Sequence, residues 1–153
     1  MKQYLILFLS ICLFACGDDE PGAGCAPKNV TSLSATTLIE DYITENNLNM
    51  ELSPEGLYYD IINPGSSEKP TLEDQVTVTY RGYYRNDCEF DASNDVSFGL
   101  TGLIEAWQLG IPLLGKGGSM LLIAHPDLAY GPSPNNGIKA GEPLIFDISL
   151  LDF

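Results

Sequence analysis

The stretch that decides the fold is Leu103-Ile104-Glu105-Ala106-Trp107. Its apolar residues recur at helical spacing, and Gly110 and Pro112 follow it, so we predict one short helix over residues 103–109. Residues three and four apart are neighbours on a helix, which would place Leu103, Ile104 and Trp107 on one apolar face. Such an apolar face must be buried against other parts of the chain, and the segments before and after the helix can cover it.

Strand patterns flank the predicted helix on both sides. Val76-Thr77-Val78-Thr79-Tyr80 alternates between apolar and polar residues, which places Tyr80 on the core side of a strand. Asn86-Asp87 is a turn signal that returns this strand toward Cys88-Glu89-Phe90 as an antiparallel hairpin. Further strands are predicted over residues 57–62, 120–124 and 144–150. Antiparallel strands around one short helix make an α+β architecture.

Another helix is predicted ahead of these strands, over residues 35–47. Ser34 or Thr36 can cap its first turn. Its apolar stripe lies opposite acidic residues and consists of Leu38, Ile39, Tyr42 and Ile43. A single short stripe favours docking of the helix against the domain, and a dimerisation helix is the alternative.

Four short motifs follow one another in a particular order. They are Phe90-Asp91, Leu103-Ile104-Glu105-Ala106-Trp107, Leu128-Ala129-Tyr130-Gly131 and Leu144-Ile145-Phe146-Asp147. In this order, over residues 56–153, they resemble the FKBP family of peptidyl-prolyl isomerases. The resemblance implies an FKBP-like antiparallel sheet wrapped around one short helix, to which this chain adds the N-terminal helix.

The resemblance also implies a pocket for a proline ring. Its catalytic residues would be Tyr80, Phe90, Asp91, Ile104, Trp107, Tyr130 and Phe146, and its further substrate-binding residues would be Phe98, Leu103 and Ile138. The family implies that the Ile104 backbone N–H and the Tyr130 hydroxyl donate hydrogen bonds to substrate carbonyls. Asp91 would be a polar contact at the rim. For any one aromatic residue taken alone, a place in the core is the alternative.

The reaction implied by this resemblance requires no nucleophile, metal or cofactor. Rotation about a peptide bond costs about 18–20 kcal/mol because resonance is lost. A dry aromatic pocket lowers this barrier, since it removes the water that stabilises the planar amide and holds the proline ring during rotation. One histidine and scattered cysteines provide no recognisable metal-ligand spacing.

The resemblance therefore implies a prolyl isomerase that accelerates the folding of envelope or secreted proteins. Its partners would be proline-containing polypeptides, and the family's macrolide inhibitors are candidate ligands. The alternative is a proline-dependent binding module, or a chaperone or assembly accessory, with little turnover. Seven basic and 21 acidic residues give a net charge of −14, which argues against nucleic acid as a partner.

The N-terminal residues predict export and a lipid anchor. A basic start and an apolar run up to Ala15 suit a signal peptide and are too short to span a bilayer comfortably. The run ends in Leu13-Phe14-Ala15-Cys16, which resembles a bacterial lipobox, so residues 1–15 are predicted to be a lipoprotein signal peptide and Cys16 the lipidated residue. An ordinary signal peptide with an incidental cysteine is the alternative. The lipid would anchor the protein in the bacterial cell envelope, on the periplasmic or surface face of the outer membrane.

The rest of the chain divides into three predicted parts. Residues 16–33 are a flexible linker, residues 34–55 are the N-terminal helix and a connection, and residues 56–153 are the FKBP-type isomerase domain. Once Cys16 carries the lipid, two cysteines remain after processing. In an oxidising compartment we predict a disulfide between Cys25 and Cys88, with two unconnected thiols as the alternative.

Overall fold

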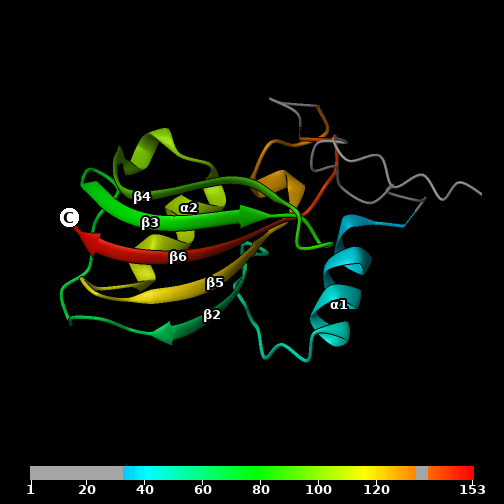
Figure 1. Ribbon diagram of the computed structural model, residues 1–153, viewed down its shortest axis with the longest axis horizontal. Coiled ribbons are helices and arrows are strands. Elements are labelled where there is room, and N and C mark those ends of the chain that lie inside the picture. The colour runs from blue at the N-terminus through cyan, green and yellow to red at the C-terminus, as the bar shows by residue number, and fades with distance from the viewer. Residues whose placement is uncertain (1–32, 134–137) are drawn as a thin grey trace, which may run out of the picture.

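The computed structural model describes residues 33–133 and 138–153 (Figure 1). The predicted signal peptide, the predicted lipidation site Cys16, and Cys25 lie outside these residues. Within them the helices are α1 (Ala35–Glu45) and α2 (Glu105–Gly110), with the 3-10 helices η1 (Leu100–Gly102), η2 (Ile111–Leu113) and η3 (Pro126–Leu128). The strands are β1 (Glu51–Leu52), β2 (Tyr58–Asn63), β3 (Gln75–Tyr83), β4 (Glu89–Gly99), β5 (Ser119–Ala124) and β6 (Leu144–Asp152).

The described strands form one antiparallel sheet in the order β1-β2-β5-β6-β3-β4. Along β3, Val76, Val78 and Tyr80 are buried while the residues between them are only partly covered, as the alternating pattern predicts. The inner face of the sheet packs against α2, where Ala106 and Trp107 are buried (Figure 1). The predicted architecture, an antiparallel sheet around one short helix, is confirmed.

The central helix begins later than the sequence predicts. Leu103 and Ile104 are both extended, with φ/ψ of −93°/170° and −61°/150°, and α2 begins only at Glu105. Leu103 closes η1 by donating its N–H to the Leu100 carbonyl, and Ile104 is the N-cap of α2. The prediction that Leu103, Ile104 and Trp107 share a helical face is therefore wrong. Leu103 and Ile104 lie in the bend between η1 and α2, and only Trp107 is within the helix.

Helix α1 packs against the opposite face of the sheet. Its N-cap is Ser34, whose hydroxyl accepts a hydrogen bond from the Thr37 N–H at 3.2 Å. Two of its buried side chains form a cluster with residues of β3, β5 and β6; this outer cluster consists of Ile39, Tyr42, Tyr83, Leu121, Ile123 and Ile145. The predicted docking of this helix is confirmed. The short strand β1, which pairs with β2, was not predicted.

None of the helices described in residues 33–133 and 138–153 is long and apolar enough to cross a membrane.

Candidate functional site

An open cavity of about 220 Å³ lies on the inner side of the sheet beside α2. Its walls come from β3, β4, the bend before α2, α2 itself, the turn after η3, and β6. The lining residues are Tyr80, Phe90, Asp91, Phe98, Leu103, Ile104, Trp107, Tyr130 and Phe146. These are nine of the ten residues predicted for the pocket. The tenth, Ile138, is 7% exposed within the core cluster and is not among the lining residues.

The floor of the cavity is the Trp107 indole, which is only 4% exposed. Its ring makes edge-to-face contacts with Tyr80, at 5.0 Å between centroids, and with Phe146, at 5.5 Å. Phe146 in turn meets Phe90 edge to face at 5.7 Å. Such perpendicular pairs fix ring orientations beyond what apolar burial alone would do. The floor and one wall are therefore preformed.

The Trp107 indole N–H is buried and has no hydrogen-bond acceptor among the described residues. A buried donor without a partner is uncommon and requires an explanation. Trp107 lines the cavity, but this atom stays buried although the cavity is open, so the N–H lies on the packed side of the indole.

The packing of the pocket rings requires a glycine in β3. A Cβ added at Gly82 would lie 2.7 Å from the Phe90 Cζ and 3.0 Å from the Phe146 Cε1. Both rings therefore rest directly on the strand backbone. Sequence reasoning did not single out Gly82, although a glycine inside a strand pattern is a general signal of close approach.

Hydrogen-bond donors lie at the rim of the cavity. The Tyr80 hydroxyl donates to the Asp91 Oδ2 at 2.6 Å, a charge-assisted bond that holds the exposed carboxylate in place. Burial, and then the nearby Asp91 carboxylate, raise the pKa of Tyr130. Its hydroxyl thus remains protonated at neutral pH. The backbone N–H of Ile104 has no acceptor among the described residues, so both predicted donors are available.

Burial, and then the hydrogen bond to Asp91, also raise the pKa of Tyr80 well above its ordinary value. Tyr80 therefore keeps its proton and remains the donor to Asp91 across the physiological range.

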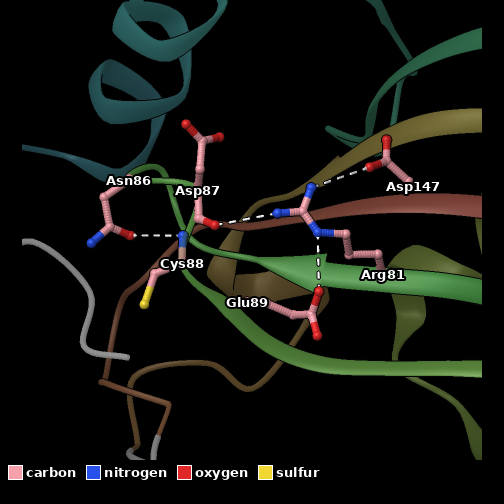
Figure 2. A network of polar contacts seen from close by, with 6 residues as sticks. All are labelled: Arg81, Asn86, Asp87, Cys88, Glu89 and Asp147. Atoms are coloured by element: carbon pink, nitrogen blue, oxygen red, sulfur yellow. Dashed lines mark hydrogen bonds and ion pairs between the residues drawn. The ribbon is translucent and has the colours of Figure 1, made fainter. Parts of the chain in front are cut away.

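The start of β4, which leads into Phe90, is fixed by polar contacts at the hairpin (Figure 2). The Arg81 guanidinium donates to the Glu89 carboxylate at 3.1 Å and to the Asp87 backbone carbonyl at 3.3 Å. The Asn86 side-chain oxygen accepts from the Cys88 N–H at 3.3 Å. Asp87 has a φ of 61°, which an aspartate tolerates better than most residues, and closes the predicted turn.

Cys88 in this hairpin is disulfide-bonded. Its predicted partner, Cys25, lies outside the described residues, so this pairing stays a prediction.

The site contains no recognisable nucleophile and base. His125 is away from the cavity lining, and its Nδ1 accepts from the Asp127 N–H at 3.3 Å as the cap of η3. No group of three or more histidine, cysteine or acidic side chains that could hold a metal ion is found among residues 33–133 and 138–153. What the site offers is an apolar concave floor with hydrogen-bond donors around it.

The structure therefore combines an aromatic cavity, with hydrogen-bond donors at its rim, and an antiparallel sheet packed against one short helix. Residues 66–151 match the family described as FKBP-type peptidyl-prolyl cis-trans isomerase. The chain belongs to this family.

Individual relatives agree with this membership. The chain is similar to the FKBP-type peptidyl-prolyl cis-trans isomerase FkpA of Escherichia coli K12, with 37% identity over 107 residues, which are 67% of this chain and 40% of that protein. It is also similar to the outer membrane protein MIP of Legionella longbeachae, with 36% identity over 103 residues, which are 64% of this chain and 44% of that protein. The chain thus matches less than half the length of these relatives.

Among solved structures, the crystal structure of FkpA from Escherichia coli superimposes with a TM-score of 0.70 at 34% sequence identity. The superposition covers 77% of this chain and 56% of that one. The similarity therefore extends over most of the fold described above.

Proposed function

We propose that this protein catalyses cis-trans isomerisation of X-Pro bonds in polypeptides of the bacterial cell envelope. The observation that supports the proposal best is the convergence of nine family-type residues on one preformed aromatic cavity. Family membership over residues 66–151 points to the same activity. Macrolide inhibitors of the family are candidate competitors for this pocket.

In the proposed mechanism the proline ring of the substrate rests on Trp107 and against Phe146. The apolar walls exclude water, which otherwise stabilises the planar amide of the ground state. The Ile104 N–H and the Tyr130 hydroxyl hold the flanking carbonyls while the bond between them rotates. Catalysis here is tighter binding of the twisted amide than of the planar one, so no proton transfer by Asp91 is required.

The proposal is tested by measuring peptide isomerisation with residues 16–153 lacking the lipid. A short Leu-Pro peptide is followed by a protease-coupled assay, for the wild type and for Tyr130→Phe. Loss of one hydrogen bond to the transition state should lower kcat/KM by up to about tenfold. The matched control is Tyr59→Phe, which removes a hydroxyl bonded to Glu51 at 3.0 Å on the far strand β2 and should leave kcat/KM unchanged.

A folded wild-type domain that gives no acceleration would contradict an isomerase. The proline-dependent binding module would then be the better description of the pocket.

We further propose that a lipid on Cys16 anchors the protein in the envelope. The lipobox-like Leu13-Phe14-Ala15-Cys16 supports this, as does similarity to a relative that is itself an outer membrane protein. Mass spectrometry of the N-terminal peptide from a bacterial host should show cleavage before Cys16 and acyl chains on it. Cleavage elsewhere, or an unmodified Cys16, would leave the anchor without support.

A further inference from the structure

A buried ion pair lies close to the pocket but does not line it. The Arg85 Nε lies 3.4 Å from the Glu142 Oε1, and the two side chains are 14% and 1% exposed. This is a contact between charges and not an aligned hydrogen bond, because neither the Arg85 Nε nor the Glu142 oxygens have a hydrogen-bond partner among the described residues. Glu142 is the only charged residue that is buried in the described part of the chain.

Glu142 lies at the neck of the loop that follows Tyr130. The Gly141 N–H donates to the Gly131 carbonyl at 3.3 Å and closes this neck. Tyr130 immediately precedes Gly131, and Glu142 immediately follows Gly141. Glu142 and Tyr130 are therefore the chain neighbours of the two glycines that this backbone hydrogen bond joins.

The other member of the ion pair, Arg85, lies near the opposite wall of the pocket, which Phe90 forms. It lies at the β3–β4 hairpin, next to Tyr84, whose ring is 5.0 Å from that of Phe90 between centroids. Phe90 lines the cavity. The ion pair therefore links the strand side of the pocket to the loop side.

Stability alone does not account for this pair. Burial raises the pKa of Glu142, and the opposing charges of Arg85 and Lys139 only partly offset the effect. A group whose folded pKa is raised favours the folded state in its protonated form, so ionised Glu142 is a cost at neutral pH. Buried ion pairs are often no better for stability than apolar residues of similar volume, and in some proteins they serve to fix geometry instead.

We propose that the Arg85–Glu142 ion pair positions Tyr130 at the mouth of the pocket by fixing the Gly131–Gly141 neck against the β3–β4 hairpin. Both residues are positioning residues, since they act through Tyr130 and do not touch substrate. The inference rests on the proposed isomerase function for its kinetic consequence, but its structural consequence can be measured without turnover.

The kinetic test is a double-mutant cycle between Glu142→Gln and Tyr130→Phe in residues 16–153. If the pair acts through the Tyr130 hydroxyl, Glu142→Gln should lower kcat/KM about five- to tenfold in the wild-type background and less than about twofold in Tyr130→Phe. Equal losses in both backgrounds would overturn the inference. Asp152→Asn is the matched control, because it removes an exposed ion pair with Lys116 near the far end of β6 and should change neither value.

The structural test is amide hydrogen exchange at Gly141, which reports opening of the neck. Exchange of the Gly141 amide should accelerate about tenfold in Glu142→Gln, while the central β6 amides stay as protected as in the wild type. Unchanged exchange at Gly141 would overturn the inference whatever the kinetics. If the wild type is inactive but Glu142→Gln shows this exchange pattern, the proposed function is contradicted while the inference about the ion pair and the neck still holds.

A second variant covers the case in which Glu142→Gln fails to fold. Replacing the pair together, Arg85→Met with Glu142→Leu, leaves no buried charge without a partner and should preserve folding. We expect this variant to show the same acceleration of Gly141 exchange. Wild-type exchange in the folded double variant would show that apolar packing holds the neck equally well, which contradicts a role for the charges.

Discussion

Gly82 has no side chain, and this leaves room for the two aromatic rings that form walls of the pocket. The Phe90 and Phe146 rings occupy the space into which a Cβ at this position would project. At the scale of single residues, the pocket is thus shaped by an absent methyl group as much as by its aromatic rings.

Gly82→Ala should therefore damage the pocket and the fold together. Overpacking a close contact typically costs about 1–3 kcal/mol of unfolding free energy, and displacement of Phe90 should lower kcat/KM as well. Urea unfolding and the peptide assay measure the two effects. Gly99→Ala is the matched control, because a Cβ there meets nothing within 4 Å. Equal behaviour of the two variants would show that the rings are not constrained by β3.

The ionisation of Tyr130 provides a second test at this scale. Its raised pKa, from burial and then from Asp91, means that the protonated hydroxyl favours the folded state, and that this contribution is lost only as the pH rises through the folded pKa. We expect kcat/KM to be flat from pH 7 to about 10. In Asp91→Asn the pKa of Tyr130 should fall toward its ordinary value.

NMR of the Tyr130 ring measures this shift, since absorbance would mix the chain's eight tyrosines. A Tyr130 pKa that is the same in Asp91→Asn and the wild type would mean that the two groups do not interact across the rim.

At the scale of elements, α1 and the pocket occupy opposite faces of the sheet. The outer cluster around Ile39 is separate from the core that holds Trp107. Packing of α1 should accordingly influence stability far more than catalysis.

Ile39→Ala is expected to separate these two properties. Ile39 is fully buried, and truncating such a residue costs about 2–4 kcal/mol. Thermal unfolding should show this loss, while kcat/KM measured well below the transition stays within twofold of the wild type. Glu40→Ala, on the exposed side of the same helix, is the control for helix content. A large fall in kcat/KM for Ile39→Ala would indicate coupling through the sheet.

Residue spacing predicted the elements whose hydrophobic period is unambiguous. The stripe of α1 and the alternation of β3 were placed correctly, since both periods persist over several residues. The bend at Leu103 and Ile104 could not be found this way, because helical spacing looks the same whether two residues begin a helix or precede it. The resemblance nevertheless assigned both to the pocket, and both are among the residues that line the cavity.

Other features depend on contacts that one sequence does not display. The burial of Ile138 follows from how the loop before β6 meets the core, and the two-residue strand β1 is too short to show a period. The Tyr80–Asp91 bond joins neighbouring strands through a bulged register, so no spacing rule along the chain connects the two residues.

At the scale of the whole molecule, the predicted disulfide joins the linker to the hairpin that leads into the pocket. Cys88 is bonded, and with Cys25 as its partner the closed loop would be long. Cys25→Ser should then lower the free energy of unfolding by about 3–4 kcal/mol, because the denatured chain regains the entropy of an open loop. Urea unfolding gives the free energy, and alkylation followed by mass spectrometry gives the thiol count. A Cys25→Ser variant as stable as the wild type would indicate a different partner for Cys88.

Trp107 is the chain's single tryptophan, and it forms the floor of the pocket. All of the protein's indole fluorescence consequently originates at one functional position. The emission of the unmodified protein should respond when a proline ring covers this indole. Occupancy of the pocket can therefore be followed optically by a label that the sequence already contains, even for ligands that are bound and never turned over.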